Sequence, residues 1–319
     1  MLNVRVISPS DRTDAALTLL YGDAGATLIT VQRGAAVEPA GDLIECVVAR
    51  ESADDVLTAL TELGITRRGS IALREVDTLL SDIAEEAVES APAPTSDSVV
   101  WQELVAQTGE AATLTPSFLA FITIACLLAV VGVATDSAVT IVGAMVVGPE
   151  FGPLAATAVA LVRKDFRLAA HSALALLVGF PVAMGIAWPA TLLFDHWGWI
   201  PPDSLDHLRN VDFIYKVGPF SVVVALLAGA AGMLAIMTPK SAALVGVFIS
   251  VTTIPAAGFA VVAATMGEWH KAFMSIGQLA VNMVGIVVAG TIVLWLRPRH
   301  MIRGGSLDKL RRWWLSDNA

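Results

Sequence analysis

Residues Gly148–Pro153, which read Gly-Pro-Glu-Phe-Gly-Pro, interrupt an apolar stretch that runs from about residue 138 to residue 162. The stretch is long enough to cross a lipid bilayer, and the interruption falls near its middle. An unbroken helix bonds all of its backbone groups internally, and lipid offers no replacement for a lost bond. Two prolines, two glycines and a carboxylate at that depth are therefore expected to lie against protein or a water-filled cavity.

A second apolar stretch, residues 241–266, is also interrupted near its centre, at Thr252–Pro255. Interrupted helices at corresponding places in the two halves of a membrane protein are a strong sequence indication of a transport site. The polar groups on which function depends are therefore expected inside the membrane.

The chain carries a weak internal repeat. Ser137-Ala138 is matched by Ser241-Ala242, and the interruption at Pro153 is matched by that at Pro255. A repeat unit of three spans, which is an odd number, predicts that the two halves have opposite orientations in the membrane. Chance similarity between two apolar segments rich in small residues is the alternative.

Six apolar blocks are each close to the roughly 20 residues that a helix needs to cross the hydrocarbon core. The blocks are residues 117–134, 138–162, 168–193, 218–237, 241–266 and 272–296. Because basic loops are retained in the cytoplasm, the basic loop 163–167 and the basic tail 297–319 place both termini there, in a multi-pass protein of the inner (plasma) membrane. A re-entrant hairpin at 138–162 would move the loop outside and is disfavoured.

Charge divides the chain into an acidic part and an apolar part. Residues 1–110 hold 7 Lys and Arg against 19 Asp and Glu, whereas the remainder holds 13 against 10. The whole chain is 55% hydrophobic, which is typical of a membrane protein. Nucleic acid is excluded as a partner, because neither part has the basic excess that a nucleic-acid-binding face needs. An acidic water-soluble module is thus expected before a membrane domain at residues 117–296.

The first 76 residues alternate β-branched runs with helical patterns in the order βαββαβ. This order predicts a ferredoxin-like α+β domain, which we place at residues 1–85. Such sheets bind metabolites or pair edge to edge, so a homo-oligomer is expected, with a dimer favoured. Residues 86–116 are interpreted as a linker and an interfacial helix, with a plain helical linker as the alternative. The tail 297–319 is interpreted as a basic cytoplasmic segment.

The run from Ser137 to Met145, followed by Gly152-Pro153, resembles the signature of a prokaryotic membrane family catalogued as a domain of unknown function (DUF 389). Further similar stretches are Ala228–Gly232, Ser241–Val247, Asn282–Ile286, Ala53–Leu57 and Glu62–Ile65. The resemblance implies an integral membrane protein with a cytoplasmic βαββαβ domain, and it supplies no substrate. Glu150 departs from the apolar residue that is usual at its position in the family, so a role for it would belong to a subgroup.

Glu150 is the most informative ionisable residue of the apolar part. A carboxylate at bilayer depth costs a few kcal/mol to insert, so such residues are usually functional or paired. Proton uptake by Glu150 would permit proton-coupled transport, and a structural role in bracing the broken helix is the alternative. Thr252, Thr253 and Asn282 would offer polar groups to a small solute or cation, although helix–helix hydrogen bonding is the commoner use. The candidate pathway residues are Gly148, Pro149, Glu150, Gly152, Pro153, Thr252, Thr253, Pro255 and Asn282.

Two functions from different classes fit these patterns. The favoured one is a transporter or channel-like protein for a small solute or ion, regulated by the cytoplasmic domain. The alternative is a membrane-anchored sensor or assembly protein whose soluble domain binds a metabolite or a partner. The sequence has no Ser-His-Asp order, HExxH motif or nucleotide-binding loop, so no enzyme activity, cofactor or metal is expected.

Overall fold

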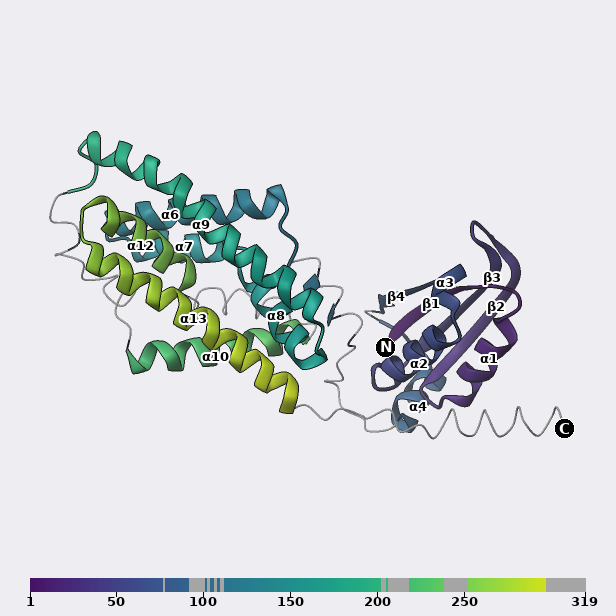
Figure 1. Cartoon of the computed structure of the whole chain (residues 1–319). Helices are drawn as coiled ribbons and strands as arrows, with labels where there is room; N and C mark the ends of the chain where they lie inside the picture. Colours follow the sequence, from purple (N-terminus) through teal and green to yellow (C-terminus); the bar gives the residue numbers. More distant parts are fainter. Residues whose placement is uncertain are drawn as a thin grey trace. The chain divides into compact units, whose positions relative to one another are not determined.

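The computed structural model of the protein describes residues 1–76, 78–91, 101, 104–105, 108–109, 112–201, 205, 218–237 and 252–296. Its chain forms two compact units, of which the first runs from Met1 to Gln102 and the second from Glu103 to Pro298. A small antiparallel sheet with helices makes up the first unit, and the described elements of the second unit are all helices (Figure 1). The expected combination of a small N-terminal sheet with a mostly helical remainder is confirmed.

The first unit has four strands in the spatial order β2-β3-β1-β4, and every neighbouring pair is antiparallel. Val4 in the central strand β1 faces Cys46 of β3 on one side and Leu73 of β4 on the other. The elements are β1 (Leu2–Ser8), α1 (Thr13–Gly22), β2 (Ala26–Val37), β3 (Ala40–Val48), α2 (Arg50–Glu62), α3 (Ile65–Arg68), β4 (Ser70–Glu75) and α4 (Asp82–Ser90).

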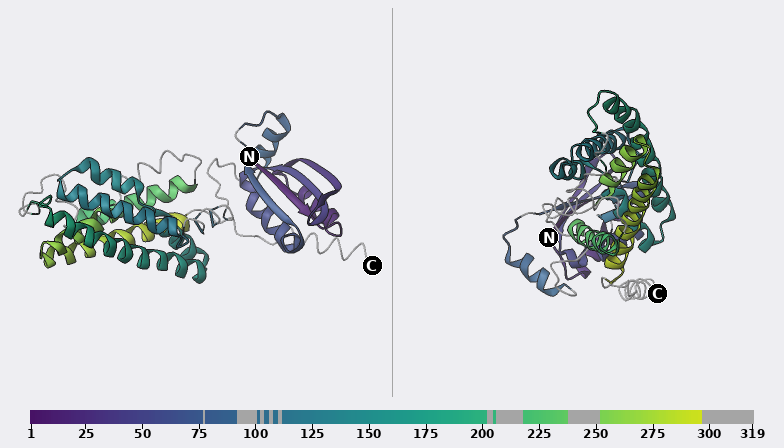
Figure 2. Two further views of the ribbon diagram at one scale, coloured as in Figure 1. Left: turned by 90° about the horizontal axis from the view of Figure 1, so that it is seen from above. Right: turned by 90° about the vertical axis from the view of Figure 1, so that its left-hand side faces the viewer.

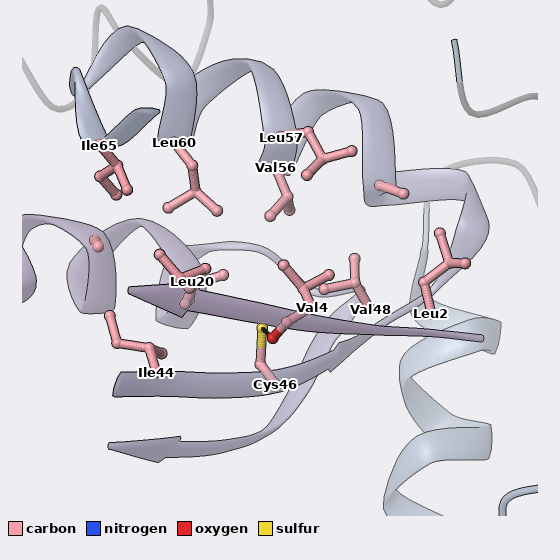
Figure 3. Close-up of a cluster of buried hydrophobic side chains, with 13 residues drawn as sticks. Leu2, Val4, Leu20, Ile44, Cys46, Val48, Val56, Leu57, Leu60 and Ile65 are labelled. Atoms are coloured by element: carbon pink, nitrogen blue, oxygen red, sulfur yellow. Dashed lines mark hydrogen bonds between the residues drawn. The ribbon is translucent and has the colours of Figure 1, made fainter. Parts of the chain in front are cut away.

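The core of this unit lies between one face of the sheet and its helices. Leu2, Val4 and Val6 of β1 alternate with less buried residues, because successive side chains of a strand point to opposite faces. Figure 3 shows Leu2 and Val4 on the side of the sheet that faces Val56 and Leu60 of α2, and all four side chains are buried. The alternation in the sequence therefore decides which face of the sheet carries the helices.

Helix α4 lies partly within the range expected to be a linker. Residues 82–90 form a helix where the sequence predicted a linker from residue 86 onward. Ser81 caps the helix by accepting a hydrogen bond from the Ala84 N–H, and Ala84 and Ala87 are buried. This packing stabilises a helix that the polar sequence did not indicate. The interfacial helix expected around Trp101 falls largely outside the described residues, as does the tail 297–319.

Asp42, at the start of β3, is a buried carboxylate in the first unit. Its Oδ1 accepts a hydrogen bond of 2.8 Å from the Gly34 N–H, and Oδ2 lies 3.9 Å from Arg33. The hydrogen bond from Gly34, followed by that from Thr13, holds the pKa of Asp42 below its ordinary value. The folded state therefore stabilises the ionised form of the Asp42 side chain.

The second unit contains four helices that are long and apolar enough to cross a membrane, namely α6, α9, α10 and α13. Helices α7 and α8 together meet the same test but are bent by 51° at their junction. The described residues thus contain four or five candidate spans, which supports the expected membrane protein. The described helices of this unit are α6 (Pro116–Ala134), α7 (Ala138–Val147), α8 (Phe151–Arg163), α9 (Phe166–His196), α10 (Pro219–Met237), α12 (Thr253–Thr265) and α13 (Trp269–Leu296).

The expected count of six spans depends on residues 241–266, and residues 238–251 lie outside the described part of the chain. The described part of this stretch is the short helix α12. It packs against α6, α9 and α13, and Figure 1 and Figure 2 show it among the longer helices of the unit. Every residue from Thr253 to Ala263 is buried, whereas α13 exposes Phe273, Val284 and Trp295. Helix α12 is therefore an interior element, and α13 has a face left for lipid.

Close contact between α12 and α6 is made possible by Gly258. A Cβ at this position would lie 2.5 Å from the Cβ of Ala129, which is well inside van der Waals contact. Gly277 on α13 provides a comparison, because a Cβ there would meet nothing within 4 Å.

Replacement of Gly258 by alanine is expected to force α12 away from α6 and to destabilise the helical unit by about 1–3 kcal/mol, a typical cost of overpacking. The thermal melting temperature of the purified full-length protein measures this effect. Gly277→Ala is the matched control and should leave the melting temperature unchanged or slightly raised, since alanine favours a helix where space is free. Equal losses in both variants would contradict the close approach.

The Asp42 carboxylate makes the first unit sensitive to acid. Because the folded pKa lies below the unfolded value of about 3.9, this group stabilises the fold at pH above about 4, and the contribution is lost as pH falls through the folded pKa. Scanning calorimetry of the full chain between pH 3 and pH 7 should show a weaker acid-induced loss in Asp42→Asn than in the wild type. Identical pH dependence in the two proteins would exclude Asp42 as a source of acid sensitivity.

Candidate functional site

The first interruption separates α7 from α8. Helix α7 ends when the Gly148 N–H donates to the Ala144 carbonyl at 3.1 Å. Pro149 has no N–H and cannot continue the helix, so the chain turns and α8 begins at Phe151, with Glu150 as its N-terminal cap residue. The bend of 51° thus has a specific cause in the sequence, and it brings the side chain of Glu150 into the interior of the unit.

The carboxyl group of Glu150 contacts the second interruption. Its Oε1 accepts a hydrogen bond of 2.6 Å from the hydroxyl of Thr253, which is 103 residues away in the sequence. Glu150 is 3% exposed and Thr253 is fully buried. The other oxygen, Oε2, is buried and has no hydrogen-bond partner among the described residues. One oxygen of the carboxyl group is therefore hydrogen-bonded, and the other has no partner among the described residues.

Gly148 leaves the space that this carboxyl group occupies. A Cβ at Gly148 would lie 2.3 Å from Oε2 of Glu150 and 2.7 Å from Cγ1 of Ile254. Any larger residue would displace either the carboxyl group or the start of α12. The glycine of the first interruption is thus required by the contact between the two interruptions.

A second polar group joins the start of α12 to α13. The side-chain amide of Asn282 donates to the Thr252 hydroxyl oxygen at 2.7 Å, and the amide of Gln278 donates to Oδ1 of Asn282 at 3.2 Å. Gln278 and Asn282 are buried, whereas Thr252 is partly exposed. Oε1 of Gln278 has no hydrogen-bond partner in the described part of the chain. Thr253 therefore bonds Glu150, whereas the adjacent Thr252 bonds Asn282.

The electrostatic environment of the site comes from helix ends rather than from charged partners. Helices α8 and α12 both begin here, and their free N–H groups carry partial positive charge. The Lys and Arg residues of the described helical unit lie at helix ends or in loops, at Arg163, Lys164, Arg167 and Lys271. Within the described residues Glu150 forms no ion pair. Its charge, when present, is not balanced by any described basic side chain.

The structure brings together the polar residues that the sequence singled out, in two pairs. Glu150 contacts Thr253, and Thr252 contacts Asn282. The remaining candidates shape the backbone instead, since Pro149 ends α7 and the first turns of α8 and α12 contain Gly152, Pro153 and Pro255.

Sequence reasoning missed Gln278 and Ser275 on α13. Ser275 is fully buried and donates a hydrogen bond of 2.7 Å to the Ala256 carbonyl of α12. Residues 275, 278 and 282 follow one another at intervals of three and four, so they lie on one face of an otherwise apolar helix. This polar stripe was the signal in the sequence that would have identified both residues.

Residues 145–288 match a protein family described as "Domain of unknown function (DUF389)", which confirms the expected resemblance over this range. The matched range contains both interruptions and Asn282. Over 255 residues, the chain is 21% identical to an uncharacterized protein of Methanocaldococcus jannaschii, an alignment that covers 78% of this chain and 74% of the relative. No solved structure matches the chain.

The hydrogen bond between Thr253 and Glu150 can be tested with a pair of isosteric and conservative variants. Thr253→Val keeps the volume and removes the donor, so the buried carboxyl group loses its partner, at an expected cost of about 1–3 kcal/mol in stability. Thr253→Ser keeps the hydroxyl and should retain the hydrogen bond at the cost of one methyl group. Thermal melting of the purified variants measures both, and a valine variant no less stable than the serine variant would contradict the contact.

Proposed function

We propose that the protein is a plasma-membrane transporter or channel-like protein for a small solute or ion, and that its pathway passes the two interruptions. One observation carries the proposal, namely the bond between Glu150 and Thr253 that joins the interruptions inside an apolar helical unit. Polar groups at membrane depth are costly, and they are typical of solute and ion pathways. The proposal makes the residues around this bond the binding site.

Helix lengths support an arrangement of six spans in two related halves. Pro116 and Pro219 begin helices of 19 residues each, and Phe151 and Thr253 begin helices of 13 residues each. Long helices follow, α9 with 31 residues and α13 with 28. Helix α8 packs against α13 just as α12 packs against α9. We infer a repeat of three plus three spans with opposite orientations, in which residues 241–266 form a broken fifth span that corresponds to α7 and α8.

Opposite orientations would make the starts of α8 and α12 meet from the two sides of the membrane. The N-terminal end of each half-helix would then point to the same central region, where their partial positive charge stabilises an ionised carboxyl group or an acceptor on a solute. The Thr252 and Asn282 pair offers polar groups beside it. Movement of one half against the other would expose this region alternately to the two sides.

The first unit is proposed to regulate transport from the cytoplasm. Its element order βαββαβ and strand order β2-β3-β1-β4 support a ferredoxin-like domain. The basic loop at residues 163–167 and the basic tail support cytoplasmic termini. Edge strands β2 and β4 are each paired on one side only, which supports a homo-oligomer formed through the sheet.

A membrane-anchored sensor or assembly protein is the second candidate. The burial of Glu150, Gln278 and Asn282 favours it, because polar side chains packed in this way also serve to hold helices together. In that case the interruptions would be structural, and the protein would move no solute.

Transport by wild-type protein and Glu150→Gln in liposomes distinguishes these candidates. The glutamine variant keeps the size and the acceptor of Glu150 and removes its titratable group, so folding is expected to persist and any transport to lose its pH dependence. Flux of a panel of ions and small metabolites, measured between pH 5 and pH 8, provides the test. A pH profile unchanged by the substitution would contradict a coupling role for Glu150, and a folded wild-type protein that moves no solute of the panel would contradict transport.

A further inference from the structure

We infer that the two interruptions bind one alkali-metal cation, such as Na⁺, at the free carboxylate oxygen of Glu150. The inference rests on the proposed function, because it names the ion that the same pathway takes. Among the described residues of the site, buried hydrogen-bond acceptors outnumber the donors that reach them.

Two buried oxygens have no hydrogen-bond donor among the described residues. Oε2 of Glu150 is buried and has no donor among the described residues, although a carboxylate accepts about four hydrogen bonds. Oε1 of Gln278 is a second buried acceptor that has no donor among the described residues. An ionised carboxylate that stays unpaired in apolar surroundings is strongly unfavourable, so the group binds either a proton or another cation. At alkaline pH, where protons are scarce, we infer that a metal cation completes the site.

The charge of the site selects a monovalent ion. Glu150 is the one carboxylate of this buried group, and no described Lys or Arg side chain pairs with it. The described residues contain no group of three or more His, Cys, Asp and Glu that could hold a metal ion, so a site of the zinc type is not among them. A single negative charge is balanced by a single positive charge, which suits an alkali-metal ion better than a divalent one.

The Thr253 hydroxyl and a carbonyl at the end of α7 are the further oxygen ligands that we infer. The Thr253 hydroxyl donates a hydrogen bond to Oε1, and no described donor uses its lone pairs, which can therefore face a cation. The Met145 carbonyl in the last turn of α7 has lost its usual donor, because the residue four positions later is Pro149. Carbonyl groups of a helix point toward its C-terminal end, here the interruption, and such freed carbonyls ligate Na⁺ in broken helices.

Gly148 provides the means to close the site without removing a charge. A Cβ at this position would lie 2.3 Å from Oε2 of Glu150, in the space beside the free oxygen. Gly148→Ala is therefore expected to exclude the cation or to turn the carboxyl group away from it, and the titratable group would remain.

Equilibrium binding of radioactive ²²Na⁺ to purified full-length protein tests the inference. At pH 8, in choline chloride, the wild type is expected to bind about one Na⁺ per chain in a saturable manner. Glu150→Gln and Gly148→Ala should each weaken binding at least about tenfold, and Thr253→Val should weaken it more than Thr253→Ser. Thr191→Val is the matched control, because Thr191 is a buried threonine whose hydroxyl donates to the Ala187 carbonyl of its own helix. This variant should bind Na⁺ like the wild type.

Folded wild-type protein that binds no ²²Na⁺ would overturn the inference, and so would binding that survives both Glu150→Gln and Gly148→Ala. If Glu150→Gln fails to fold, the comparison of Thr253→Val with Thr253→Ser decides in its place. Flux measured in the same liposomes keeps the two proposals apart. Transport that depends on pH and does not depend on Na⁺ would overturn the cation site and support the proposed function. Bound Na⁺ without any flux would support the cation site and contradict the proposed function.

Discussion

The helical unit depends on one hydrogen bond, between the buried carboxyl group of Glu150 and the hydroxyl of Thr253. A carboxyl group in apolar surroundings, with no basic partner in the described residues, needs a donor from the protein. The bend between α7 and α8, the absence of a side chain at Gly148 and the burial of α12 together allow this donor to reach the carboxyl group.

The arrangement of helices explains how an apolar chain can hold so many polar groups. Helix α12 is short and consists largely of small, buried residues, so it has little surface that could face lipid. The long helices expose large apolar side chains instead. Its first residue, Thr253, contacts Glu150, and its N-terminal cap residue, Thr252, contacts Asn282. The polar groups are thus gathered at the start of one interior helix, where unsatisfied backbone N–H groups are also found.

Much of this organisation could be predicted from the sequence, because hydropathy and proline placement act locally. The break at Pro149 was evident, as were the long helices and the alternating strands of the first unit. The pairing of Glu150 with Thr253 rather than Thr252 was not, since it depends on how two distant helices meet. Gln278 was not predicted, because its role depends on the contact with Asn282 one turn further along α13. Helix α4 was not predicted, because its two buried alanines give a weak pattern.

The central claim is that the polar groups at the interruptions are reached by water. Thr252 is partly exposed, whereas Val284 of α13 is 62% exposed on an apolar helix. Single cysteines at these positions, with the buried Cys46 and Cys126 replaced by alanine, can be treated in native membranes with a small charged thiol reagent. The account predicts that Thr252→Cys is labelled and that Val284→Cys, facing lipid, is not, since the thiolate forms only in water. A cysteine at residue 252 as inert as that at residue 284 would contradict it.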